Sequence, residues 1–187
     1  WRSLVIMTTT CLVLIPIAWH FLKDYQKERI LTFLSPERDP LGSGYHIIQS
    51  MIAVGSGGFW GKGFLKGTQT QLKFLPEQQT DFVFSVFAEE WGFAGSIVLL
   101  LLYLLLVMRG LDTMRRAKDE FGMMLAAGIT IMFSVYFFVN VGMTLGIMPV
   151  VGIPLPFMSY GGTALLSNFI SAGVLINVRT RRFSLFY

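Results

Sequence analysis

Charged residues are scarce in this chain of 187 residues, where Asp, Glu, Lys and Arg make up 14%. Soluble domains carry about 25% charged residues. With a hydrophobic fraction of 53%, the scarcity argues against a soluble globular protein and against intrinsic disorder. The formal net charge is only +4, and nucleic-acid binding would need a basic stripe that the chain lacks. We therefore expect a membrane protein that binds no nucleic acid.

Cysteine and histidine are almost absent. The single cysteine, Cys11, lies in an apolar run, which excludes an internal disulfide and a cysteine metal cluster. His20 and His46 are far apart in the sequence, and their spacing does not fit a zinc site. The GxSxG and HExxH motifs are also missing, so the familiar serine and zinc hydrolases have no support.

The chain contains long apolar runs. A helix that spans a bilayer needs about 20 mostly apolar residues. Residues 121–178 contain no Asp, Glu, Lys, Arg or His, and the prolines and glycines of 148–161 divide this stretch into two helices. We predict an all-α polytopic membrane protein with about four transmembrane helices, near residues 3–22, 91–108, 121–147 and 162–178.

Basic residues predict the orientation of these spans, because short cytoplasmic loops carry an excess of Lys and Arg. The 109–120 loop and the tail after 178 hold such residues: Arg109, Arg115, Arg116, Lys118, Arg179, Arg181 and Arg182. We expect both segments to be cytoplasmic, which places a large structured loop, 23–90, outside. Because the chain begins at Trp1, we expect residues 1–187 to be the C-terminal part of one integral membrane domain.

Two segments of the outer loop each have two interpretations. Residues 45–54 have helical periodicity, which fits an amphipathic helix on the membrane face or a helix packed on the spans. The glycine-rich stretch 55–63 fits tight turns. Its backbone N–H groups, beside Lys62 and Lys66, could instead hold a pyrophosphate.

Asp81 follows Pro76 and precedes the second predicted span. It could cap the helix that leads into this span, as could Thr80. Alternatively, Asp81 is a carboxylate just above the membrane that acts as a base on a lipid-linked substrate. Glu89 and Glu90 lie nearer the hydrocarbon, where acidic residues tend to be functional or paired with basic ones.

The stretch from Asn140 to Ala164, NVGMTLGIMPVVGIPLPFMSYGGTA, resembles the signature of the SEDS family (shape, elongation, division and sporulation). DPLGSGYHIIQSMIAVGSGG and LPEQQTDFVFSVFAEEWG are similar to the large outer loop of this family. The resemblance thus covers essentially the whole chain. The GYHIIQS and GTQTQLKFLPE stretches look more like the elongation member than the division member.

This resemblance implies a peptidoglycan glycosyltransferase that polymerises lipid II during cell elongation. It implies a multi-pass protein of the bacterial inner (plasma) membrane with its catalytic loop on the outer face. Asp81 matches the aspartate of the family's TDF element, which implies that it is the general base of an inverting hexosyl transfer. The implied partner is a class B penicillin-binding protein, the transpeptidase.

The chemistry of such a transfer indicates further site residues. A carboxylate that takes the acceptor's proton is worth about 10²–10⁴-fold in rate. The leaving lipid pyrophosphate needs cationic or N–H stabilisation, for which Lys62, Lys66 and the glycine stretch are candidates, alone or with a divalent cation. Glu77, Ser159 and Tyr160 are the other predicted substrate-binding residues. Membrane lipids and lipid tails would lie against the spans, with the proline segment as a cavity wall.

Two other classes of function compete with the glycosyltransferase. A lipid II flippase or transporter would suit broken helices around a cavity, although the third and fourth spans offer no charged path. A scaffold for cell-wall enzymes would leave Asp81 as a helix cap.

Overall fold

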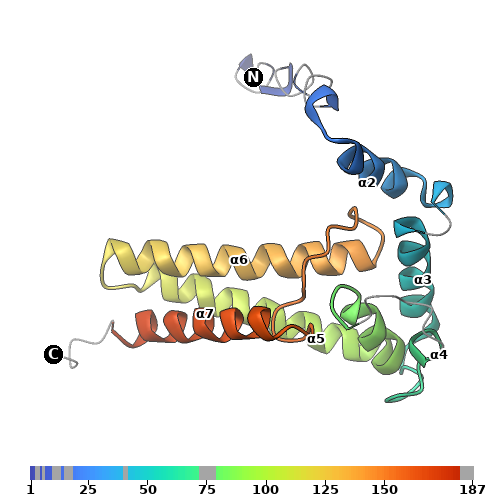
Figure 1. Cartoon of the computed structure of the whole chain (residues 1–187). Coiled ribbons are helices and arrows are strands. Elements are labelled where there is room, and N and C mark those ends of the chain that lie inside the picture. Colours follow the sequence, from blue (N-terminus) through green and yellow to red (C-terminus); the bar gives the residue numbers. More distant parts are fainter. Residues whose placement is uncertain are drawn as a thin grey trace. The chain divides into compact units, whose positions relative to one another are not determined.

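The computed structural model describes residues 1–2, 5, 7–9, 14, 19–39, 42–71 and 79–181. The regular elements among these residues are all helices (Figure 1). The prediction of an all-helical protein is therefore confirmed. The chain divides into two compact units, Trp1–Tyr45 and His46–Tyr187. Most of the predicted span 3–22 falls outside the described residues.

The first unit contains helix α2, Asp24–Leu34, and the short 3-10 helix η1, Pro36–Arg38. The side chain of Gln26 closes the start of α2 by accepting a hydrogen bond from the Lys23 N–H at 3.0 Å. After η1 the chain turns into α3, Ser43–Ser56, where the Tyr45 N–H donates to the Asp39 carbonyl at 3.2 Å.

Three long helices form the body of the second unit: α5, Val83–Arg115; α6, Glu120–Thr144; and α7, Gly162–Thr180. They lie side by side in Figure 1 and pack on one another. A hydrophobic core joins α5, α6 and the segment before α7, and it consists of Phe84, Ala88, Tyr103, Val141 and Leu155. Asp119 caps α6 by accepting from the Gly122 N–H. The predicted helices 91–108, 121–147 and 162–178 fall on these three elements.

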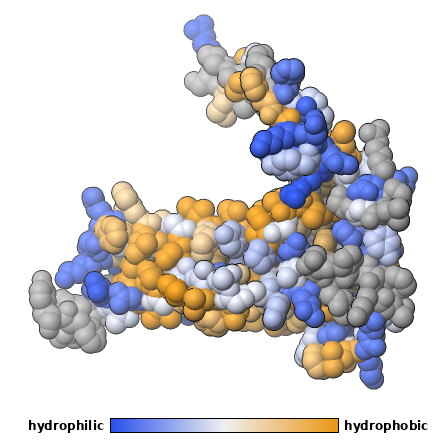
Figure 2. Space-filling model, in the orientation of Figure 1, coloured by the Kyte–Doolittle hydropathy of each residue, from blue (hydrophilic) through white to orange (hydrophobic). Residues whose placement is uncertain are grey.

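Large apolar side chains cover the outside of this bundle (Figure 2). They include Val98, Leu101, Leu102, Leu105, Phe138, Phe169 and Ile170, each more than half exposed. Soluble monomers rarely expose an apolar surface so extensive. In the part of the chain that the structure describes, α5 and α6 are long and apolar enough to cross a membrane.

Helix α3 packs on the bundle through small and polar residues. Its Ser50 is fully buried, and its hydroxyl contacts Ser85 Oγ on α5 at 2.5 Å and donates to the Thr144 carbonyl of α6 at 2.7 Å. Ile47 and Ala53 are also buried, whereas Met51 and Ile52 are 40% and 45% exposed. Of the two interpretations of residues 45–54, the helix packed on the spans is confirmed.

A break in α5 explains the glycine-rich stretch. Gly92 has φ +68° and ψ −164°, so the helical hydrogen bonds across it are lost. The loop before α4, Thr68–Gln71, replaces them. The Glu89 and Glu90 carbonyls accept from the N–H groups of Lys62 and Gly63 at 3.0 Å, and the Phe93 and Ala94 N–H groups donate to the carbonyls of Gly58 and Phe59 at 2.9 and 3.0 Å.

The glycines permit this close contact between two backbones. A Cβ at Gly61 would lie 2.1 Å from the Glu90 carbonyl oxygen, and one at Gly57 would lie 2.1 Å from that of Ala88. Because the N–H groups of Gly57, Gly58 and 61–63 already have backbone acceptors, they are not free to hold a pyrophosphate. The turn interpretation of 55–63 is confirmed, and the cradle interpretation is wrong.

The proline segment, residues 145–161, folds back into the bundle between α6 and α7 (Figure 1). Leu155 and Pro156 are buried, and the Tyr103 hydroxyl of α5 donates to the Pro156 carbonyl. Phe157 has φ +64°, and its ring packs between Phe133 and Phe169 with centroid distances of 5.3 and 5.5 Å. The segment is irregular, as predicted. Its Pro156 carbonyl accepts a hydrogen bond from the protein, which irregular backbone within a membrane requires.

Candidate active site

The turn 79–82, which leads into α5, is held by three hydrogen bonds from elsewhere in the fold. They run from the Tyr160 N–H to the Gln79 carbonyl at 2.8 Å, from the Ser159 hydroxyl to the Thr80 carbonyl, and from the Asn140 amide to the Asp81 carbonyl at 2.9 Å. The proline segment and α6 therefore fix three successive peptide units. Asp81 is at the end of this clamped turn.

Asp81 does not occupy the N-cap position of α5. That position belongs to Phe82, and no side-chain hydrogen bond from it caps the helix. The prediction that Thr80 or Asp81 is the N-cap residue is therefore wrong. Asp81 is half-buried, and its carboxylate faces Gly152, where a Cβ would lie 3.1 Å from Oδ2.

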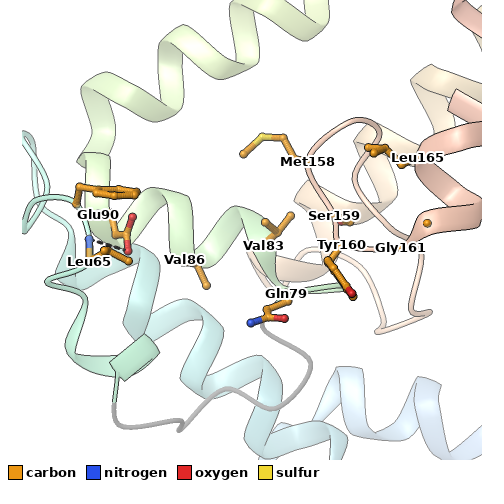
Figure 3. Close-up of a pocket in the computed structure, with 12 residues that line it drawn as sticks. Leu65, Gln79, Val83, Val86, Glu90, Met158, Ser159, Tyr160, Gly161 and Leu165 are labelled. Atoms are coloured by element: carbon orange, nitrogen blue, oxygen red, sulfur yellow. Dashed lines mark hydrogen bonds between the residues drawn. The ribbon is translucent and has the colours of Figure 1, made fainter. Parts of the chain in front are cut away.

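A groove of about 740 Å³ adjoins the clamped turn (Figure 3). Gln79 and Val83, on either side of Asp81 in the sequence, line it. In Figure 3 Leu65 and Glu90 lie at one end, with Tyr160 and Gly161 toward the other. The remaining lining residues are Phe64, Val86, Met158, Ser159, Gly162 and Leu165. The lining is thus mainly apolar, and the predicted role of the proline segment as a cavity wall is confirmed.

Glu90 is the acidic residue of this groove. Its side chain is almost buried, 8% exposed, and its Oε1 accepts from the Leu65 N–H at 3.2 Å (Figure 3). Glu89, one residue earlier, points to a different environment. It is fully buried and pairs with Lys62, with 2.8 Å between Oε1 and Nζ.

The structure separates the predicted substrate-binding residues. Tyr160 is 76% exposed and lines the groove, whereas Ser159 is 4% exposed and uses its hydroxyl inside the fold. Lys62 donates from Nζ to Ser56, Thr68 and Glu89, each at 2.8 Å. Lys66 is exposed and Glu77 lies outside the described residues. Asp81, Ser159 and Tyr160 are therefore the predicted residues that the fold brings together.

Sequence reasoning missed two residues at this site, Asn140 and Gly152. Asn140 is fully buried on α6 and is a conspicuous polar residue in a long uncharged stretch, a signal that could have singled it out. Gly152 could not have been found, because only the fold places it against Asp81. Among the described residues, no group of three or more His, Cys, Asp or Glu is placed to hold a metal ion.

The fold, the apolar surface and this site define an all-helical integral membrane protein with a carboxylate beside an apolar groove. The family model described as cell cycle protein, FtsW/RodA/SpoVE, matches residues 1–183. The chain belongs to this family, which is the SEDS family that the sequence resembles.

Named relatives agree with this membership. The chain is 52% identical over 183 residues to peptidoglycan glycosyltransferase MrdB of Escherichia coli K12, covering 97% of this chain and 50% of that protein. It is 50% identical over 161 residues to peptidoglycan glycosyltransferase RodA of Treponema pallidum, covering 86% of this chain and 37% of that protein. The chain thus spans half or less of these two relatives.

Two solved structures share the fold. One concerns the structural coordination of polymerization and crosslinking by a peptidoglycan synthase complex, with a TM-score of 0.74 and 38% identity over 98% of this chain and 50% of that one. The other is a mutant of the Thermus thermophilus rod shape determining protein RodA, with a TM-score of 0.55 and 36% identity over 66% of this chain and 39% of that one.

Proposed function

We propose that this chain forms part of a peptidoglycan glycosyltransferase that polymerises lipid II during cell elongation, with Asp81 as its general base. The observation that carries the proposal is the clamped turn, which fixes the backbone of Asp81 between Gln79 and Val83, two residues that line an apolar groove. The names of the relatives support the reaction class. The apolar lining supports a lipid-linked substrate, because a groove of this chemistry suits a hydrocarbon chain.

The reaction is a single displacement at the anomeric carbon of the donor sugar. The acceptor hydroxyl attacks this carbon, a new carbon–oxygen bond forms, and the bond to the lipid pyrophosphate breaks. The pyrophosphate leaves with the electron pair, and the Asp81 carboxylate takes the proton of the acceptor hydroxyl. One displacement inverts the configuration at the anomeric carbon, and a fixed base contributes about 10²–10⁴-fold.

Lys66 and Tyr160 are the exposed predicted substrate contacts among the described residues. In this proposal, Lys66 stabilises the charge that develops on the pyrophosphate, and Tyr160 contacts the substrate from the groove wall. Lys62 would reach a phosphate only by leaving Glu89. Glu77 stays a predicted contact. We assign the catalytic loop to the outer face of the bacterial inner membrane and propose a class B penicillin-binding protein as partner, which the synthase-complex neighbour supports.

The test is glycan-strand synthesis from lipid II by the purified full-length protein with its transpeptidase partner. We expect Asp81→Asn to lower the rate of synthesis by about 10²-fold or more, because an amide cannot take a proton at neutral pH. Membrane abundance and partner binding should be retained, because the backbone carbonyls of Thr80 and Asp81 hold the turn and Asn is close to Asp in size.

Asp119→Asn is the matched control. Asp119 caps α6 at the other end of the bundle, and Asn caps a helix equally well, so this variant should keep its full rate. Normal synthesis by Asp81→Asn would remove Asp81 from the mechanism. Lipid II binding without synthesis by the unmodified protein would instead favour a transporter or a scaffold.

A further inference from the structure

Asn140 makes an unusual pair of hydrogen bonds inside the bundle. Its amide nitrogen donates to the Asp81 carbonyl at 2.9 Å and to the Ile153 carbonyl at 2.8 Å. The residue is fully buried on α6, and the three groups come from three separate parts of the sequence. A single side chain therefore ties α6, the clamped turn and the proline segment together.

The two bonds hold both sides of the same contact. One holds the backbone of Asp81 itself. The other holds the backbone of Ile153, the neighbour of Gly152. Gly152 faces the Asp81 carboxylate so closely that a Cβ added to it would lie 3.1 Å from Oδ2. Asn140 thus ties the backbone of Asp81 to the backbone that lies opposite its carboxylate.

The Asn140 side-chain carbonyl Oδ1 is buried and has no hydrogen-bond partner in the part of the chain that the structure describes. A buried acceptor without a partner lowers stability, whereas the Asn140 amide nitrogen satisfies the Asp81 and Ile153 carbonyls, which an apolar residue would leave without this donor. Each unsatisfied group in a native structure calls for an explanation, and a role in function is one such explanation.

We infer that Asn140 is a positioning residue for the Asp81 carboxylate, an inference that rests on the proposed function of Asp81. Asn140 is fully buried, whereas Asp81 is half-buried, so Asn140 acts through Asp81 and not on the substrate. A misplacement of about 1 Å in a reacting group can cost about 10²-fold in rate. Loss of the Asn140 amide should therefore slow the reaction and leave substrate binding intact.

The experiment is a double-mutant cycle on kcat and KM for lipid II polymerisation by the full-length protein, with Asp81→Asn and Asn140→Ser. Ser is too short to reach both carbonyls. We expect Asn140→Ser to lower kcat by about 10–100-fold, with KM changed less than about threefold. In the Asp81→Asn background the same substitution should change kcat by less than about threefold, because no base remains to be positioned.

Asn140→Thr guards against failure to fold, because Thr and Ser each keep one hydroxyl donor but Thr is closer to Asn in volume and leaves a smaller cavity; it should retain more activity than Asn140→Ser. Thr130→Ala is the structural control. Thr130 is buried on the same helix and donates to Ala126, so its loss should lower thermal stability and leave kcat unchanged. An equal fall in kcat with and without Asp81 would overturn the inference alone. Full activity of Asp81→Asn would overturn both the inference and the assigned base.

Discussion

At the scale of single residues, the site depends on Gly152, which places no side chain opposite the Asp81 carboxylate. Gly152 has φ +77°, a conformation that other residues rarely adopt, and it faces the Asp81 carboxylate. A side chain at this position would meet two obstacles, the strained backbone and the carboxylate oxygen. The glycine therefore gives the carboxylate room while the backbone around it stays fixed.

Gly152→Ala should lower strand synthesis at least about tenfold, because the new Cβ displaces either the carboxylate or the proline segment. Gly128→Ala is the control, since nothing lies within 4 Å of a Cβ there. That variant should keep its activity, with stability unchanged or raised by up to about 1 kcal/mol. Polymerisation rates and thermal unfolding of the purified variants check both expectations, and an active Gly152→Ala would contradict them.

The Lys62–Glu89 ion pair shows how a charge predicted to bind substrate can serve the fold. Glu89 is fully buried, and its Oε1 also accepts from the Gln69 N–H at 3.0 Å. Without Lys62 the buried Glu89 carboxylate would lack its ion-pair partner, which would strongly destabilise the protein. The pair therefore holds the loop before α4 on α5. From the sequence, a lysine beside glycines is equally compatible with a phosphate site.

At the scale of elements, the break in α5 is the feature on which the outer loop depends. Four hydrogen bonds exchanged between α5 and the glycine stretch replace those lost at Gly92. The exchange places Glu90 in the groove and directs Glu89 toward Lys62. A continuous helix would have no carbonyls or N–H groups left for the loop.

Gly92→Ala should therefore destabilise the protein by more than about 3 kcal/mol, because the change combines a positive φ with a backbone clash. A Cβ at Gly92 would lie 2.2 Å from the Gly61 nitrogen. Gly173→Ala on α7, with open space around the Cβ, should cost nothing. Thermal unfolding in detergent and the folded yield from membranes measure the difference. Equal stability of the two variants would contradict the role of the break.

At the scale of the whole molecule, charge collects where α5 passes into α6 (Figure 2). Asp112 pairs there with Arg116 at 2.6 Å and with Arg179 of α7 at 3.2 Å. The predicted loop 109–120 is largely helical, because α5 continues to Arg115. Arg116, just after α5, and Arg179, near the end of α7, thus lie together at one end of an apolar bundle. From the positive-inside rule, we expect this end to face the cytoplasm.

Cysteine labelling tests this orientation in a Cys11→Ser background, which removes the single native cysteine of the chain. A cysteine at Lys66, which is exposed in the outer loop, should react with an impermeant maleimide in spheroplasts. One at Met114 should react only after lysis. Labelling of Met114 in intact spheroplasts would reverse the assigned topology.

Local patterns predicted the positions of the three long helices, although α5 extends beyond the predicted 91–108 at both ends and α2 was not predicted. Uncharged runs and the proline cluster indicated α5, α6, α7 and the irregular segment between α6 and α7, because hydropathy and proline geometry act within a few residues of the chain. The start of α5 was not predictable in the same way. Its N-cap position falls on Phe82, because hydrogen bonds from Asn140 and Ser159 hold the preceding turn and no capping side chain defines it.

The sequence by itself determined the membrane class, the helical segments, the basic end of the bundle and the family, through composition and a contiguous signature. It also indicated Asp81. The tertiary structure alone decided that Lys62 pairs with Glu89, that the glycine stretch fills a helix break, and that Asn140 and Gly152 flank Asp81. These outcomes depend on contacts between residues far apart in the chain, and no local pattern encodes such contacts.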